Sequence, residues 1–136
     1  MSLRSYIFMK QSDGGIKGIY CHRNGELDMV GQCLYENYHE ANDLESLINL
    51  GNIAELGETV EETIAYVRDN HEQWEDNQWL CLKNESQLYQ RNDMMISYQY
   101  LYDVENYIWY VFHRDEGGHW IKEELYDALV KEEAFE

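Results

Sequence analysis

The chain has 136 residues and a formal net charge of −17, and 44% of its residues are hydrophobic. This length is typical of one domain with one buried core, so we expect a single domain spanning residues 1–136. The apolar content excludes a disordered acidic tail. The acidic excess argues against direct binding to nucleic acid or to anionic membranes, because proteins bind phosphate groups through Lys and Arg.

The compartment is indicated by apolar runs and by cysteines. No apolar run approaches the roughly 20 residues of a membrane span, and we see no charged segment followed by an apolar core of the secretory type. Cys21, Cys33 and Cys81 are odd in number and have no repeated spacing, a pattern typical of reduced thiols. We therefore expect a cytoplasmic protein with no membrane partner.

The first 21 residues predict a β-hairpin. Residues 5–9 and 16–21 are rich in apolar and aromatic side chains, as strands are. The segment Asp13-Gly14-Gly15 between them is a strong turn signal.

Two helices are predicted next. Over residues 30–38, large apolar side chains recur every four positions. The following helix has Asn42 as a candidate N-cap and Glu45 three residues later, as in a capping box. It ends at Gly51, which suits the left-handed position after a helix. Residues 53–56 are expected to continue as a short turn.

The middle of the chain is less regular. Residues 59–67 fit both a helix face and a strand, and we favour a strand in their second half. The acidic stretch 69–78 is predicted as a loop or short helix. Residues 79–82 are predicted as a short strand and 84–93 as a loop.

The clearest β-signal lies over residues 94–113. Ile96 and three tyrosines at even positions alternate with other residues, and aromatic and β-branched side chains fill 107–113. This pattern predicts an antiparallel hairpin with its turn at 103–106. Beyond Gly117-Gly118, residues 121–133 are predicted as an amphipathic helix.

This order of elements predicts an α+β fold, with a single antiparallel sheet and helices packed on one face. The aromatic ladder at residues 98–110 is either an exposed stacking platform or a sheet face covered by helices. Stacking on nucleic acid needs a basic groove, which the composition lacks, so we favour the covered face. An exposed aromatic strand would instead serve a protein interface or pair with a second copy as a homodimer.

Several segments carry a resemblance. Residues 18–25 read Gly-Ile-Tyr-Cys-His-Arg-Asn-Gly, and 47–57 read Leu-Ile-Asn-Leu-Gly-Asn-Ile-Ala-Glu-Leu-Gly. With 63–69 (Thr-Ile-Ala-Tyr-Val-Arg-Asp) and the tyrosine run at 98–103, they resemble a family of small uncharacterised proteins of bacteriophages, prophages and other mobile elements. The matches run in consistent order from about Arg4 to Val111. The resemblance implies shared ancestry and fold, and assigns no activity.

The chain departs from the family pattern after Cys-His, where Arg23 and Asn24 replace a Trp and an Asp. Asn24 cannot supply a negative charge, whereas Asn-Gly still forms a tight turn. The departure therefore favours a structural role for the motif. The motif residues are Tyr20, Cys21, His22 and Gly25.

Cys21 and His22 are the only adjacent pair that suggests a nucleophile with its base. Neighbouring residues of a strand point to opposite faces, so Cys21 would need a distant histidine instead. Buried free cysteines are usually inert. No Cys or His pair has the spacing of a zinc knuckle, and no phosphate loop or hydrolase motif is present. We expect no catalytic residue, metal or cofactor.

Acidic residues are concentrated in one stretch. Fourteen of them, and a single basic residue, Arg68, lie between Asn24 and Leu82. This bias either keeps the protein soluble or docks it on a basic protein as an accessory factor. In its sharpest form such a factor mimics nucleic acid, which carries one charge per roughly 1.7 Å. The candidate binding residues are Glu55, Glu58, Glu61, Glu62, Asp69, Glu72, Glu75 and Asp76.

Two other hypotheses belong to different classes. One is a small-ligand binder or enzyme that uses Cys21, His22 and a second histidine. The other is a self-assembling structural protein whose exposed aromatic strand pairs with a second copy. We rank docking on a basic protein first, because it alone uses the concentrated charge.

Overall fold

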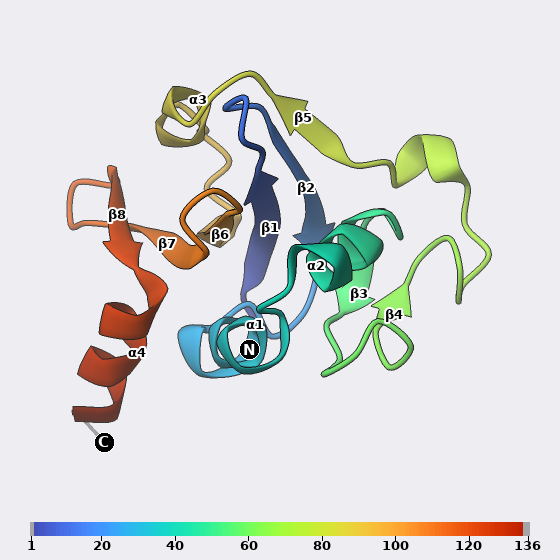
Figure 1. Ribbon diagram of the computed structural model, residues 1–136, viewed down its shortest axis with the longest axis horizontal. Coiled ribbons are helices and arrows are strands. Elements are labelled where there is room, and N and C mark those ends of the chain that lie inside the picture. Colours follow the sequence, from blue (N-terminus) through green and yellow to red (C-terminus); the bar gives the residue numbers. More distant parts are fainter. Residues whose placement is uncertain (1, 135–136) are drawn as a thin grey trace.

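The computed structural model describes residues 2–134. The strands are β1 (Arg4–Lys10), β2 (Ile16–Cys21), β3 (Ile53–Glu55), β4 (Ile64–Ala65), β5 (Leu80–Leu82), β6 (Ile96–Asp103), β7 (Ile108–Arg114) and β8 (Trp120–Glu124). The helices are η1 (Leu27–Gly31, a π-helix), α1 (Gln32–Asn37), α2 (Ala41–Ile48), η2 (Trp74–Asp76, a 3-10 helix), α3 (Ser86–Tyr89) and α4 (Leu125–Ala134). Within the described residues the eight strands form one sheet (Figure 1), in the order β4-β3-β2-β1-β6-β7-β8, with β5 also paired to β2.

Both predicted hairpins are present. β1 pairs with β2 and β6 pairs with β7, each antiparallel. The two hairpins meet through β1 and β6, which run parallel, and β3 also runs parallel to β2. The sheet is therefore mixed, and the prediction of an antiparallel sheet is wrong. Hairpin signals are local and set the strand direction within each hairpin, not between hairpins far apart in the sequence.

One residue of β6 interrupts the predicted alternation. Arg4 pairs with Ile96 and the next residue, Ser5, pairs with Tyr98, so Ser97 forms a bulge. The extra residue places Ile96 on the opposite face from the tyrosines that follow. Ile96 accordingly packs in a different hydrophobic cluster from Tyr100.

The segment after β7 differs most from the prediction of a helix over 121–133. Residues 120–124 form β8, which pairs with β7, and helix α4 begins at Leu125. A turn at 115–119 is closed by the Asp115 N–H bonding to the His119 carbonyl at 2.9 Å. It brings the chain onto the edge of β7, where backbone hydrogen bonds to the sheet override the helical spacing of the side chains.

Smaller elements also differ from prediction. Helix α2 begins after Glu40 and has no side-chain cap, so the predicted capping box at Asn42 is wrong. Residues 53–55 form a strand instead of a turn, and 84–93 contain a short helix. The strand predicted at 79–82 is confirmed as β5.

The sheet buries side chains on both faces. Alternate strand residues point to opposite sides, and two hydrophobic clusters result. Ile7 and Val111 join residues of α1, α2 and α4 in the first cluster, whereas Phe8 and Phe112 join Leu88 of α3 in the second. The prediction that all helices pack on one face is therefore not confirmed.

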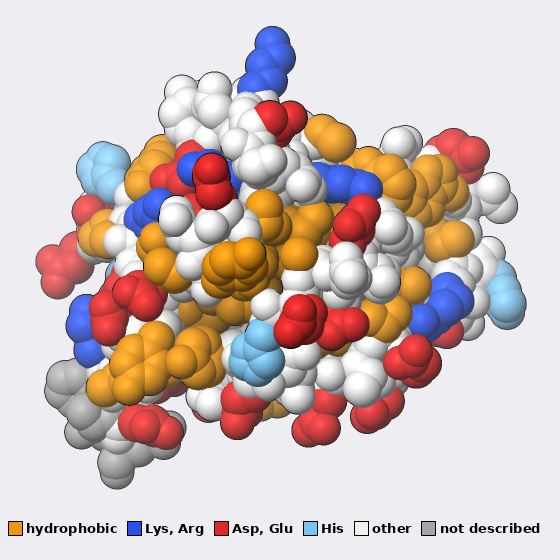
Figure 2. All heavy atoms as spheres, viewed as in Figure 1, with side chains coloured by type: hydrophobic (Ala, Val, Ile, Leu, Met, Phe, Trp, Pro, Cys, Tyr) orange, Lys and Arg blue, Asp and Glu red, His pale blue; other side chains and the backbone are white. Residues whose placement is uncertain are grey.

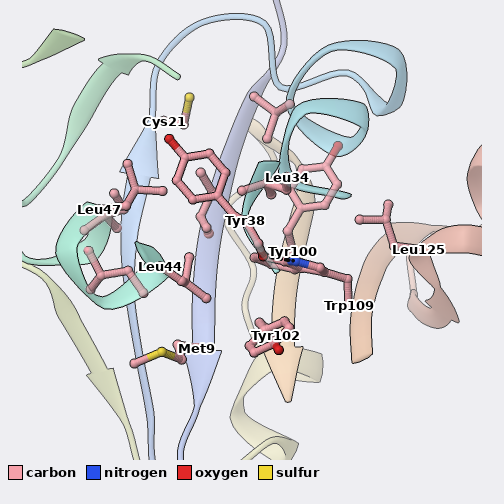
Figure 3. Packing of buried hydrophobic residues seen from close by; sticks show 14 of the residues in the cluster. Met9, Cys21, Leu34, Tyr38, Leu44, Leu47, Tyr100, Tyr102, Trp109 and Leu125 are labelled. Atoms are coloured by element: carbon pink, nitrogen blue, oxygen red, sulfur yellow. Dashed lines mark hydrogen bonds between the residues drawn. The ribbon is translucent and has the colours of Figure 1, made fainter. Parts of the chain in front are cut away.

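Four aromatic side chains connect the first cluster to the loops around it. Each donates its polar hydrogen to a backbone carbonyl, which is what a buried Tyr or Trp requires. The bonds run from Tyr38 to Gly57, Tyr100 to Gly25, Tyr102 to His39 and Trp109 to Tyr38, at 2.7 to 2.9 Å. Figure 3 shows these rings pointing into the cluster from the sheet and from the end of α1. The covered aromatic face predicted from the sequence is thus buried at Tyr100, Tyr102 and Trp109.

Candidate functional site

The Cys-His motif lies at the end of β2. Cys21 is fully buried in the first cluster (Figure 3), and its thiol donates to the Arg23 carbonyl at 3.3 Å. Burial raises the pKa of the Cys21 thiol to about 12. Because the thiolate is the reactive form, this cysteine is held in its unreactive state near neutral pH.

The rest of the motif makes structural contacts. The Nδ1 atom of His22 lies 2.8 Å from the Tyr20 hydroxyl, on the face opposite Cys21. Gly25 accepts the Tyr100 hydroxyl hydrogen through its carbonyl, and a Cβ on Gly25 would lie 2.9 Å from the Leu3 carbonyl oxygen. The structure does not bring Cys21 and His22 together.

The segment that contains the Cys-His motif binds residues 52–55. The side chain of Asn52 accepts the Tyr20 N–H at 2.9 Å, and the His22 N–H donates to the Ile53 carbonyl at 3.1 Å. The side-chain amide of Asn24 donates to Glu55 at 2.9 Å. These contacts join β2 to β3, so they give the motif residues a structural role in the fold.

We expect the three thiols to react in the order of their exposure. Cys81 is exposed, Cys33 is intermediate and Cys21 is buried. A thiol reagent should therefore label Cys81 first and Cys21 only when the protein unfolds. Mass spectrometry after timed labelling measures the order, and labelling of Cys21 in the native protein as fast as Cys81 would contradict it.

The Cys21 pKa also makes stability depend on pH. The folded protein holds the Cys21 proton more tightly than the unfolded chain does, because the pKa rises from 9.0 to about 12. The contribution of Cys21 is complete below pH 9.0 and is lost as the pH rises towards 12. Urea unfolding of the wild type and Cys21→Ala across this range should show a steeper loss in the wild type. Parallel pH profiles would contradict this.

Two hollows adjoin beside α1. One of about 270 Å³ lies between η1, α1 and the residues after β3, and one of the same size lies between α1, α2 and residues 58–61. They share Asn37 and Glu58 in their linings, so the two hollows lie next to each other and make up one acidic region. We call it the acidic groove, and its carboxylates are Asp28, Glu36, Asp43, Glu55, Glu58 and Glu61.

Within residues 2–134, the acidic groove has a cation beside it, Arg68, whose pKa is raised by its hydrogen bond with Asp69 and also by the charge of Glu61. No Lys or Arg lines either hollow, and the ion pairs of that range include none of the six carboxylates. Burial raises the pKa of the Cys33 thiol at the groove wall, and the charges of Glu58 and Glu36 raise it further. The groove therefore has a negative potential.

Arg68 is the one Lys or Arg in the acidic stretch, and its contacts are within its own loop. Its guanidinium donates to the carbonyls of Val60 and Thr63 and pairs with Asp69 at 3.0 Å. The Asp69 carboxylate in turn accepts the Ala65 N–H at 2.7 Å. This cation closes the loop around β4 and does not line the groove.

The structure separates the eight predicted binding residues. Glu55, Glu58 and Glu61 line the acidic groove. The others lie outside its lining: Glu62 bonds to Thr59, Asp69 to Arg68 and Glu72 to Asn77, and Glu75 and Asp76 belong to η2. Whether any of the eight binds a partner stays a prediction.

Sequence reasoning left Asp28, Glu36 and Asp43 out of the candidate residues. A signal was present for two of them, because Asp28, Gln32 and Glu36 are four apart and residues at that spacing share a helix face. Asp43 had no such signal. It reaches the groove only because α2 packs beside the chain that follows β3.

Several of the chain's own cations are held over aromatic rings, an arrangement that stabilises the cation by the ring's negative face. The pairs are Arg91 with Tyr6 (4.4 Å), Arg114 with Trp120 (3.9 Å), Lys122 with Tyr110 (4.1 Å) and Lys17 with Trp79 (3.6 Å). Three of these rings belong to the second cluster or pack against it, so the acidic groove faces away from most of these cations.

The remaining classes of site find no support in the part of the chain that is described. No group of three or more His, Cys, Asp or Glu side chains there could hold a metal ion. None of the helices in residues 2–134 has both the length and the apolar character to cross a membrane. Strands β6 and β7 have neighbours on both sides, so the aromatic strand considered for self-pairing has no free edge.

No family model matches the chain, and the searches of curated proteins and of solved structures also find no match.

Proposed function

We propose that the protein is a non-enzymatic binding factor that docks its acidic groove on a basic surface of another protein. One observation carries this proposal: six carboxylates line two adjacent hollows that no Lys or Arg lines. Unpaired charges of one sign in a concave surface focus the field and attract a partner of opposite sign. The partner is a basic protein.

Solubility alone explains the groove less well. A charge excess that only prevents aggregation works when it is spread over the surface. Here Glu55 and Glu58 line one hollow together with Asp28 and Glu36, which come from another part of the chain. Glu61 lines the adjacent hollow together with Asp43. The resemblance to proteins of phages and mobile elements supports a partner from the host or from the element itself. The three free cysteines support a reducing compartment such as the cytoplasm.

We expect a groove variant to lose its partner. The variant changes Glu36, Glu55, Glu58 and Glu61 to Gln, which keeps side-chain size and the hydrogen bond from Asn24 to position 55. Affinity capture from a host lysate, repeated at rising salt, should recover a basic protein with the wild type at low salt only. Direct titration of that protein should show affinity about tenfold or more weaker for the variant.

A matched control removes the same charge elsewhere. Its substitutions are Asp13→Asn, Asp93→Asn, Glu116→Gln and Glu133→Gln, all at exposed positions outside the groove lining. Equal loss of binding in the control and the groove variant would show that net charge acts and the groove does not. If the partner binds DNA, duplex DNA should compete with the protein for it; coexistence of all three in one complex would reject nucleic-acid mimicry.

A further inference from the structure

A hollow of about 520 Å³ opens on the other side of α1, between the β6–β7 turn and the start of α4. Its walls are unusually aromatic for a surface depression. We call it the aromatic pocket, and the residues that matter are Tyr35, Tyr102, Tyr107, Trp109, Tyr126 and Glu124. Figure 2 shows hydrophobic side chains gathered on this face near α4 and the β6–β7 turn, and acidic side chains along its lower edge.

Two buried and hydrogen-bonded rings form the inner wall of the aromatic pocket. Tyr102 and Trp109 are buried, with ring centroids 5.1 Å apart and planes inclined at 55°. Their polar atoms are already bonded, to the carbonyls of His39 and Tyr38. They offer a ligand no hydrogen-bonding group and little exposed surface, so the ring surface open to a ligand belongs mainly to Tyr35, Tyr107 and Tyr126.

The rim of the pocket contains a strained residue. Tyr107 is 79% exposed and has a φ of 58°, a region that large side chains seldom adopt. Asn or Gly would suit this turn better, and such strain costs on the order of 1 kcal/mol or more. Asp103 already holds the turn by accepting the Glu105 and Asn106 N–H groups. An exposed, strained tyrosine at the mouth of a pocket indicates a ligand that uses its ring.

Charge indicates what that ligand is. Glu124 and His39 line the pocket, and no Lys or Arg does. Several other rings of this chain lie under one of its own cations, as Trp120 lies under Arg114 at 3.9 Å. Within residues 2–134, no such contact involves a ring of the pocket. The rings and the carboxylate are thus open to a cation from outside.

We propose that the aromatic pocket receives an arginine side chain of the basic partner. A guanidinium stacks on aromatic rings and forms paired hydrogen bonds with a carboxylate, so it uses both features of the pocket. Helix α1 lines both depressions, with Tyr35 in the pocket and Glu36 in the acidic groove. A partner that crosses α1 contacts both. The inference that the arginine comes from a basic partner rests on the proposed function. The inference that the pocket binds a guanidinium rests only on its rings and on Glu124.

The probe that tests the pocket is a capped Gly-Arg-Gly tripeptide, compared with the neutral citrulline analogue of the same shape. Nuclear magnetic resonance on the full chain at low salt follows the indole N–H of Trp109. We expect a saturable shift of this signal with the arginine peptide, and binding of the citrulline peptide about tenfold weaker. No saturable shift, or equal binding of the two peptides, would overturn the proposal.

Tyr107→Asn separates binding from folding. Asn adopts the left-handed region more readily than Tyr, so we expect an unchanged or higher melting temperature together with peptide binding about tenfold weaker. Glu124→Gln should weaken binding about threefold to tenfold, whereas Glu133→Gln, with the same charge change on α4, should not. Wild-type affinity in both Tyr107→Asn and Glu124→Gln would reject the pocket as the site.

The outcomes distinguish this inference from the proposed function. Peptide binding at Trp109 with no partner captured by the acidic groove would leave the pocket assigned and the docking function refuted. If a captured partner binds Tyr107→Asn and Glu124→Gln as tightly as it binds the wild type, the docking function stands and the arginine assignment is refuted. Binding of tetramethylammonium, without binding of the arginine peptide, would show a site for quaternary ammonium and refute arginine.

Discussion

Trp109→Ala should lower the free energy of unfolding by about 3–5 kcal/mol, the range for deleting a large buried aromatic side chain. The indole is 5% exposed and packs in the first cluster of the sheet. Its Nε1 donates to the Tyr38 carbonyl at 2.9 Å, so the substitution leaves both a cavity and an unpaired buried acceptor. Chemical denaturation followed by circular dichroism measures the loss.

Trp109→Phe is the matched control, because it keeps an aromatic ring and removes the indole N–H. We expect it to cost less, about 1–3 kcal/mol, mostly from the unpaired carbonyl. A loss below about 1 kcal/mol for Trp109→Ala would show that the aromatic face is loosely packed. That result would also weaken the case for a rigid inner wall in the aromatic pocket.

Gly51→Ala should cost about 3 kcal/mol or more, because a strained backbone angle and an overpacked contact add at this position. The φ of Gly51 is 80°, and an added Cβ would lie 2.4 Å from the Asn77 carbonyl oxygen. That oxygen also accepts the Asn52 N–H at 2.8 Å, so it cannot move away freely. The ring of Trp74 would lie 2.8 Å from the same Cβ.

Gly118 offers the comparison for Gly51. Its φ is 83°, and a Cβ there would meet nothing within 4 Å. Gly118→Ala should therefore cost only the backbone penalty, about 1–2 kcal/mol. Thermal and urea unfolding of the two variants measure the difference, and equal losses would show that the contact with Asn77 relaxes at no cost.

In the proposed complex, the acidic groove and the aromatic pocket would contribute to binding in different ways. Exposed carboxylates such as Glu58 and Glu61 mainly speed association and make it depend on salt. A ring-lined pocket that excludes water around one side chain contributes more to affinity, because such anchors are typical binding hot spots. The proposed complex would thus form quickly through the groove and be held at the pocket by Tyr107 and Glu124.

Local patterns in the sequence were sufficient for the two hairpins and for the first two helices. Alternation in residues 16–21 and 98–102, with glycines at the first turn, depends only on neighbours along the chain. Apolar spacing likewise predicted a helix over 30–38, where η1 ends and α1 (Gln32–Asn37) follows, and Gly51 has the left-handed backbone that its position predicted. Such features can be derived from the sequence because their hydrogen bonds and buried faces are local.

The candidate sites depended on contacts that no local pattern contains. The acidic groove joins Asp28 to Glu55, and the aromatic pocket joins Tyr35 to Tyr126, in each case across segments distant in sequence. The sequence shows how many carboxylates and tyrosines the chain has, but it does not show which of them lie close together in the fold.

By itself the sequence determined the acidity, the aromatic core and the α+β class. Only the tertiary structure decided that β1 joins β6 in parallel, and that residues 120–124 extend the sheet as β8. Both outcomes arise because an exposed strand edge has unpaired backbone groups, and whichever segment is brought there gains hydrogen bonds that outweigh its own helical or loop preference. The same long-range pairing sets where the carboxylates of the groove and the rings of the pocket meet.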